Sequence, residues 1–252
     1  MLPRTTAFLA IALLLTLCST GRAAAQATFS TIPSVHFDVK YIQGVTEGEA
    51  RRILGFLQAD YDTLRSQLGM DGKEKLEVRL HDSPGRFRSE VNAGAETYSA
   101  MYVRGTMYVL TTVQASGLEK AMRYQLARVF LEPAGQRACP AWLREAFAVN
   151  HAEIIADLSP PGSVALASFS DLTQDIAEAA TPTDRNDVNF VLGRTMQFFI
   201  ERYGKQKAFG LFKEFDGTQP TETVFKKSLG EDLQTIEKAW SKYVAIKPRK
   251  GK

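Results

Sequence analysis

The hydrophobic periodicity of this chain changes near residue 116, and that change constrains the fold more than any other feature. Before residue 116, segments that alternate apolar and polar residues are mixed with segments of helical periodicity. The expected strands are 35–41, 76–80, 98–102 and 107–110, the last two joined by a turn at Arg104-Gly105. After residue 116 the periodicity is helical. The pattern predicts an α+β fold with a small mixed sheet and packed helices, followed by an all-helical half that begins within 114–140.

Capping residues set the expected boundaries of the helices. Thr46 and Glu49 form a capping box before an apolar stripe that Gly69 ends, and Ser116 with Glu119 forms a second box. Pro140 suits the first turn of a later helix, and Asp187 is expected to cap another. The predicted helices are 46–69, 116–131, 141–156, 187–203 and 231–246.

The N-terminal residues resemble a secretory signal. Arg4 precedes the apolar run 7–17, and the segment 23–27 offers small-residue cleavage sites. A membrane-spanning helix needs roughly 20 apolar residues, and this run is shorter. We expect cleavage after Ala27 and export to a bacterial periplasm or to the medium. The alternatives are a retained membrane anchor and a lipoprotein anchor on Cys18, where Leu17 is larger than the residue expected before such a cysteine.

Loss of the N-terminal segment changes the charge and the cysteine count. The expected parts are a signal peptide (1–27), an α+β half (28–132) that includes the 116–131 helix, a helical half (133–246) and a basic tail (247–252). Cleavage removes two arginines and no acidic residue, so the formal net charge falls from +3 to +1, and Cys139 becomes the only cysteine. We therefore expect no nucleic-acid partner, no internal disulfide and no integral membrane span after cleavage.

Several short segments occur in a recognisable order across most of the chain. They are His36-Phe37, Leu68-Gly69, Pro140-Ala141-Trp142-Leu143-Arg144-Glu145-Ala146-Phe147-Ala148, Glu201-Arg202-Tyr203-Gly204, Leu229-Gly230 and Trp240. The longest follows the pattern P-x-W-L-x-E-x-x-A and comes after a helix and a short loop. In this order the chain resembles the peptidase MA-like family, zinc peptidases of the gluzincin type. The resemblance implies a zincin-like version of the α+β fold.

The chemistry of that family depends on an HExxH helix. Its two histidines bind Zn²⁺ one turn apart, its glutamate is the general base, and a glutamate from the next helix is the third ligand. The resemblance places Tyr124, Gln125 and Arg128 at the HExxH positions and Glu145 at the third-ligand position. A phenol with a pKa of about 10 is a poor ligand, a guanidinium has no lone pair to give, and a carboxamide cannot accept a proton from water. We therefore expect no catalytic residues and no cofactor, although the family implies zinc.

No other motif offers a replacement site. The three histidines, His36, His81 and His151, have neither HxxxH nor HxH spacing, so no second metal site is expected. The chain also has no G-x-S-x-G elbow, phosphate loop or CxxC motif. A hydrolytic site assembled from distant residues stays open as an alternative.

A glutamate kept in a closed cleft needs a counter-charge, because a buried unpaired carboxylate is costly. We predict that Arg128 supplies this charge by pairing with Glu145, with Tyr124 bonded to the same carboxylate; the alternative is that Arg128 points to solvent. Trp142, Arg144 and Phe190 complete the expected cleft, unless Trp142 only packs in the core. Phe190 stands near the place where the family often has a tyrosine.

The predicted function is that of an exported, non-catalytic pseudo-peptidase that binds a peptide or protein segment or acts as a scaffold. Two alternatives remain. One is an active hydrolase with a non-standard or relocated site, and the other is a purely structural envelope protein.

Overall fold

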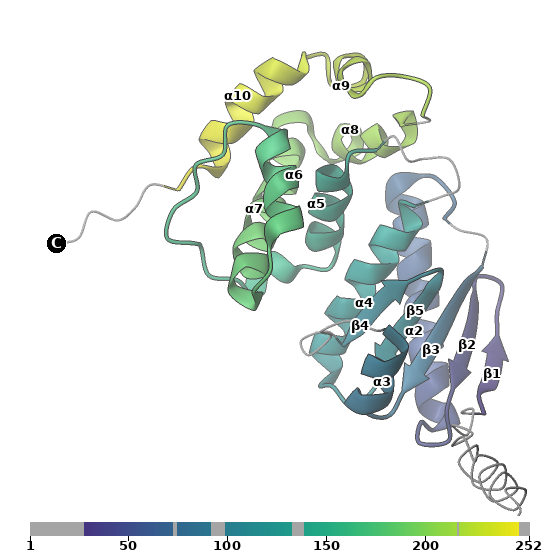
Figure 1. The fold of residues 1–252 in the computed structure, drawn as a ribbon. Helices are drawn as coiled ribbons and strands as arrows, with labels where there is room; N and C mark the ends of the chain where they lie inside the picture. The colour runs from purple at the N-terminus through teal and green to yellow at the C-terminus, as the bar shows by residue number, and fades with distance from the viewer. Residues whose placement is uncertain (1–27, 73–74, 92–98, 133–138, 216, 247–252) are drawn as a thin grey trace, which may run out of the picture.

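The computed structural model describes residues 28–72, 75–91, 99–132, 139–215 and 217–246 (Figure 1). The expected signal segment, 1–27, and the basic tail, 247–252, lie outside these residues. Within the described residues, no helix has both the length and the apolar character needed to cross a membrane.

The N-terminal half is built on a five-stranded mixed sheet with the order β1-β2-β3-β5-β4. Its strands are β1 (Ser30–Pro33), β2 (Phe37–Tyr41), β3 (Leu76–His81), β4 (Ala100–Val103) and β5 (Thr106–Leu110). The central pairs β2–β3 and β3–β5 are parallel, whereas the outer pairs β1–β2 and β4–β5 are antiparallel. The hairpin turn at Arg104-Gly105 is present, with positive φ angles of 50° and 88°. Because β4 is last in the strand order, it is an edge strand of the sheet.

Helices cover the two faces of the sheet unequally. α2 (Glu47–Leu68) and α4 (Ala115–Phe130) pack on one face, and the short α3 (Pro84–Val91) lies over the other (Figure 1). Alternate residues of β5 show the two environments, since Met107 and Val109 belong to the main core while Tyr108 and Leu110 pack in a small cluster with α3.

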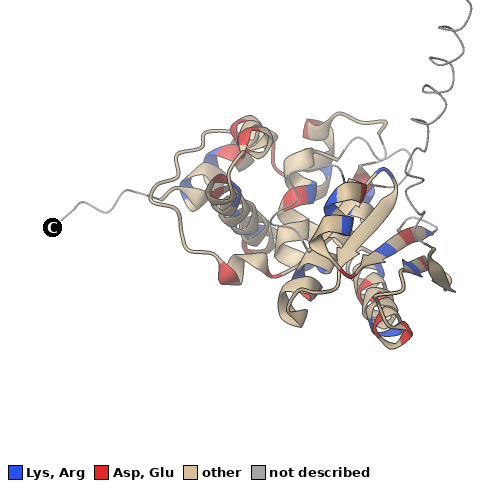
Figure 2. Cartoon of the chain, turned by 60° about the horizontal axis from the view of Figure 1, so that its bottom comes forward, with Lys and Arg blue, Asp and Glu red and all other residues tan. Residues whose placement is uncertain are grey.

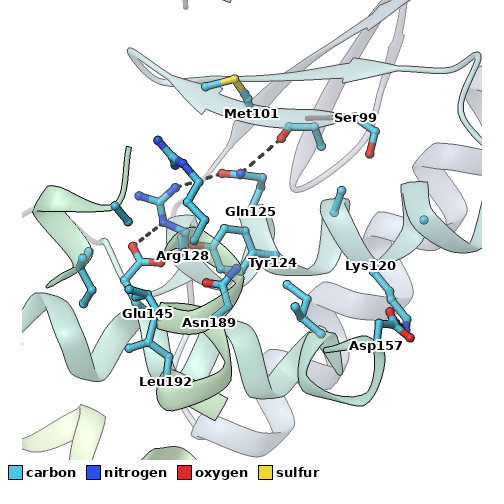
Figure 3. A pocket seen from close by; sticks show the side chains of 18 of the residues that line it. Ser99, Met101, Lys120, Tyr124, Gln125, Arg128, Glu145, Asp157, Asn189 and Leu192 are labelled. Atoms are coloured by element: carbon cyan, nitrogen blue, oxygen red, sulfur yellow. Dashed lines mark hydrogen bonds and ion pairs between the residues drawn. The ribbon is translucent and has the colours of Figure 1, made fainter. Parts of the chain in front are cut away.

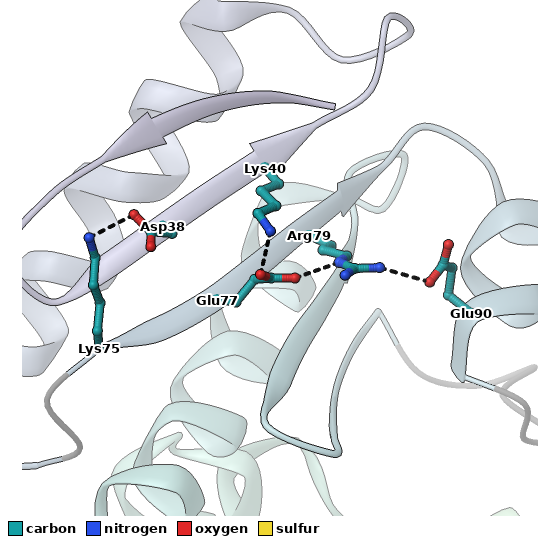
Figure 4. Close-up of polar contacts among 6 residues, drawn as sticks. All are labelled: Asp38, Lys40, Lys75, Glu77, Arg79 and Glu90. Carbon is teal, nitrogen blue, oxygen red and sulfur yellow. Dashed lines mark hydrogen bonds and ion pairs between the residues drawn. The ribbon is translucent and has the colours of Figure 1, made fainter. Parts of the chain in front are cut away.

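The thinly covered face of the sheet carries a chain of ion pairs (Figure 4). Lys40 and Arg79 contact Glu77 at 2.5 and 2.7 Å, and Arg79 also reaches Glu90 at 3.1 Å. Partial burial acts to raise the pKa of Glu77, but the two cations outweigh it and hold that pKa below its usual value. Among the described residues, positive and negative side chains are interleaved along the ribbon (Figure 2).

The C-terminal half consists of helices. They are α5 (Ala141–His151), η1 (Ile154–Asp157), α6 (Phe169–Glu178), α7 (Pro182–Tyr203), α8 (Lys205–Gly210), η2 (Leu211–Glu214), α9 (Thr221–Leu229) and α10 (Leu233–Val244). α5 packs between α4 and α7 and so connects the two halves. The thiol of Cys139, just before α5, is buried, and burial raises its pKa to about 12.

The helix ends test the capping predictions. Of the box predicted at Thr46, the hydrogen bond from the Glu49 N–H to the Thr46 hydroxyl is present at 3.2 Å, and Gly69 ends α2 with φ of 57°, as expected. The box at Ser116 is wrong, because α4 already begins at Ala115 and has no side-chain cap. Asp187 is also not a cap. It lies inside α7, which begins five residues earlier at Pro182 behind a Thr181–Asp184 capping box.

The predicted helix 141–156 is shorter than expected. α5 ends at His151, and Glu153 follows with φ of 56°, in the left-handed region. The chain then makes the short η1 turn, which turns Asp157 toward α4.

Candidate functional site

A cavity of about 880 Å³ lies between the two halves of the molecule (Figure 3). One wall is the start of β4 and one face of α4, where the lining residues recur at helical spacing from Gly117 to Arg128. The opposite wall comes from α5, η1, α6 and α7. The HExxH-equivalent positions and Glu145 all line this cavity, so the structure brings together the four residues that the sequence singled out.

Two side chains of α4 meet the carboxylate of Glu145 on α5. The Tyr124 hydroxyl donates to Glu145 Oε2 at 2.5 Å, and Arg128 Nε donates to Glu145 Oε1 at 2.8 Å. Residues 124 and 128 lie one turn apart on the same face of α4, which is why both reach one group. The predicted pairing of Arg128 with Glu145 is therefore present, and Arg128 does not simply extend into solvent.

The neighbours of Arg128 keep its guanidinium charged. Burial acts to lower the pKa of Arg128, but the neighbouring Glu145 carboxylate and Tyr124 outweigh it, so that the pKa lies above its ordinary value. The Glu145 side chain is 15% exposed and that of Arg128 is 41% exposed. The carboxylate is thus mostly enclosed, while its cation faces the cavity.

Gln125, next to Tyr124, turns toward the sheet instead of toward Glu145. Its Nε2 donates to the Ala100 carbonyl and its Oε1 accepts from the Tyr102 N–H, each at 3.3 Å. Arg128 Nη1 also donates to Gln125 Oε1 at 3.3 Å. Gln125 therefore links edge strand β4 to the Arg128–Glu145 pair (Figure 3).

A second ion pair crosses the cavity one turn of α4 before Tyr124. Lys120 of α4 contacts Asp157 of η1. Asn189 and Leu192 of α7 line the wall opposite α4. None of these four residues belongs to the site that the sequence predicted. Lys120 lies four residues before Tyr124, as Tyr124 does before Arg128, so the sequence could have predicted that it lines the same helix face. The positions of Asp157 and Asn189 depend on how the later helices pack and could not be predicted from spacing.

Three residues of the expected cleft lie elsewhere. Trp142 is 4% exposed and stacks on Phe169 at 3.9 Å in the aromatic core of the helical half, so its assignment to the cleft is wrong and the core alternative holds. Arg144 and Phe190 are half-buried but do not line the cavity. On α7 the wall is formed instead by residues on either side of Phe190, because the helix turns that position away.

The donor atoms in the cavity limit the chemistry available there. In the part of the chain that the structure describes, no three His, Cys, Asp or Glu side chains are grouped so as to hold a metal ion. Both oxygens of Glu145 already accept hydrogen bonds. The described lining residues offer contacts for both polar and apolar groups of a ligand.

Comparison with known proteins identifies the fold only. No family model and no curated protein matches the sequence. Among solved structures, native yeast LTA4 hydrolase superposes with a TM-score of 0.52 and 12% identity, over 89% of this chain and 40% of the yeast chain. An M1 zinc metallopeptidase mutant from Deinococcus radiodurans bound to a Tyr-Ser-Ala substrate gives a TM-score of 0.45 and 17% identity, over 85% and 51%. The chain thus spans about half or less of the length of these neighbours. It has a mixed α+β fold, as the sequence predicted, with a five-stranded mixed sheet and many helices, and that fold is similar to the matched part of the yeast LTA4 hydrolase structure.

Proposed function

We propose that this protein is a pseudo-peptidase, a zincin-like domain in which an ion pair stands where related enzymes hold zinc. The observation that carries the proposal is the convergence of Tyr124 and Arg128 on Glu145. Two side chains one turn apart on a helix and a carboxylate from the next helix meet at one point, as two imidazoles and a glutamate do around a zinc ion. Here the central positive charge belongs to a guanidinium.

The residues present do not fit a zinc site. Zinc ligands need an available lone pair, which the guanidinium of Arg128 lacks. Tyr124 would have to lose a proton with a pKa of about 10 before its oxygen became a good ligand. Gln125 cannot serve as general base, and its carboxamide is engaged by β4. We derive no hydrolytic step at this site.

The cavity itself supports a binding role. Its volume of about 880 Å³ falls within the range of ligand pockets, and its walls carry apolar side chains such as Met101 and Leu192 as well as the two ion pairs. We propose that it holds a peptide or protein segment without cleaving it. Export through the segment 1–27, and action in a periplasm or outside the cell, are part of the same proposal.

Rebuilding the motif tests this reading. In the triple variant Tyr124→His, Gln125→Glu, Arg128→His, two imidazoles should face Glu145, so we expect about one tightly held zinc per chain by inductively coupled plasma mass spectrometry. The wild-type protein, purified and dialysed in the same way, should retain none.

The matched control adds Glu145→Gln to the triple variant, which should weaken zinc retention at least about tenfold because one ligand loses its charge. Circular dichroism checks that each variant is folded. Stoichiometric zinc in the wild-type protein would refute the proposal. A folded triple variant that binds no zinc would show that these positions do not correspond to a zinc site.

A further inference from the structure

Edge strand β4 has an outer side that faces α4 and the cavity. The Ser99 carbonyl accepts from the Leu110 N–H at 2.8 Å on the β5 side. Because backbone groups alternate between the two sides of a strand, the Ala100 carbonyl and the Tyr102 N–H point away from β5. They are the hydrogen-bonding groups that another chain would use to extend the sheet at this point.

The side chain of Gln125 already bonds both of these backbone groups. Its carboxamide gives an N–H to the Ala100 carbonyl and a C=O to the Tyr102 N–H, each at 3.3 Å. A strand lying beside β4 would offer the same donor and the same acceptor from its own backbone. The side chain of Gln125 therefore stands in for one residue of an added strand.

Displacing this side chain would be costly. Gln125 is 4% exposed, so an incoming peptide that took its two partners on β4 would leave its buried amide N–H without an acceptor and its oxygen with Arg128 Nη1 as the remaining donor. Glutamate at this position would not do the same work, because a carboxylate can accept from Tyr102 but has no N–H for the Ala100 carbonyl.

We propose that Gln125 determines the specificity of the cleft by excluding extended chains that would bind through main-chain pairing with β4. The inference rests on the proposed function, since it concerns which segments the cavity accepts. The ligand is then held by side chains of the cavity walls, and a turn or a helix suits this mode better than a strand.

The test compares wild type with Gln125→Met, which keeps the length of the side chain and removes both hydrogen bonds. Amide hydrogen exchange measured by NMR should show Tyr102 protected in the wild-type protein and exchanging at least about tenfold faster in the variant. The Met101 amide faces β5 and should not change. A capped Lys-Thr-Val-Thr-Lys peptide is the probe for strand addition. It should shift the Ala100 and Tyr102 signals of the variant and leave the wild-type signals unmoved.

Gln125→Glu is the second variant, close in shape to wild type and useful if Gln125→Met does not fold. It should keep the protection of Tyr102 in part and admit the peptide more weakly than Gln125→Met does. The proposal is overturned if Tyr102 exchanges equally in wild type and variant. It is also overturned if the peptide pairs with β4 in the wild-type protein, or if it fails to pair with β4 in Gln125→Met, where the Ala100 carbonyl and the Tyr102 N–H have lost their bonds to residue 125. Failure of the proposed function would appear separately, as zinc in the wild-type protein.

Discussion

Two sets of polar side chains in this molecule differ in how completely they are paired. In the cleft cluster (Tyr124, Gln125, Arg128 and Glu145), both oxygens of the carboxylate and both ends of the carboxamide have partners. In the interior of the sheet half, Asp60 Oδ2 and both ring nitrogens of His81 are buried without a hydrogen-bond partner among the described residues.

The two sets should therefore differ in how much they affect the free energy of unfolding. An unsatisfied buried polar group costs about 1–3 kcal/mol, so the interior side chains limit the stability of the fold. A partly exposed ion pair contributes about 1 kcal/mol or less. The complete pairing of the cleft cluster is therefore expected to add little to the stability of the fold. Three substitutions test this contrast, in order of expected effect.

The largest effect is expected at His151. Its Nε2 lies 3.0 Å from Asp60 Oδ1, both side chains are at most 7% exposed, and the Arg123 guanidinium lies 3.7 Å from the same oxygen. His151→Leu leaves the buried carboxylate almost alone, so we expect the free energy of unfolding in urea to fall by about 3 kcal/mol.

The double variant Asp60→Leu, His151→Leu is the control, because it removes the stranded charge together with its partner. It should recover most of the loss, and the resulting double-mutant cycle gives the coupling energy. A loss below about 1 kcal/mol for His151→Leu would show that the interior pair is not a weak point, and the contrast would fail.

His81 should give an intermediate effect that depends on pH. Burial lowers the pKa of this imidazole below its ordinary 6.5, while Glu90 and Asp82 oppose the shift and Arg79 and Arg86 reinforce it. The unfolded chain therefore takes up a proton near pH 6.5 that the native protein does not bind, and stability falls as the pH drops through that value.

His81→Phe places a ring of similar shape among Phe29, Phe87 and Tyr108 and removes the titration. Relative to wild type, the variant should gain stability below pH 6.5 by up to about 1.4 kcal/mol for each pH unit, and the difference should be constant above about pH 7.5. Unfolding curves measured between about pH 5 and pH 8 would contradict this if the difference stayed constant throughout.

The smallest effect is expected in the cleft cluster. Arg128→Met removes the cation, but Tyr124 still bonds Glu145 and the site is open to the cavity, so we expect a loss of about 1 kcal/mol. Arg128→Lys, which keeps the charge, should lose less. Thermal unfolding of both variants gives the comparison, and a loss near 3 kcal/mol for Arg128→Met would place this pair among the determinants of stability.

Local spacing predicted the parts of the site that lie on one helix face. Tyr124 and Arg128 are one turn apart, and that alone put both in reach of one partner on the next helix. The contact of Gln125 with Ala100 and Tyr102 was missed because it joins residues more than twenty positions apart, and periodicity does not reveal which strand becomes the edge. Trp142 was misplaced for a similar reason, since Phe169 comes from a later helix.

For the fold, the sequence predicted the α+β class and the main strands well, but it failed at helix starts where two candidate caps compete. Thr181 and Asp184 form a reciprocal box with Pro182 in the first turn, and this arrangement starts α7 before Asp187 is reached. At Ser116 no such reciprocal box forms, and α4 begins one residue earlier, at Ala115, behind a Gln114 whose side chain makes no capping bond.

The buried thiol of Cys139 has a practical consequence for studying the cavity. The thiolate is the form that reacts with maleimides and disulfides, and a pKa of about 12 leaves almost none of it at neutral pH. Cys139 is also the only cysteine in the described part of the chain. In a chain lacking residues 1–27, and with them Cys18, a cysteine introduced on the cavity wall, for example at Asn189, would therefore be labelled selectively against an unreactive background. A fluorophore or spin label there could report when the cavity fills, without prior removal of the native thiol.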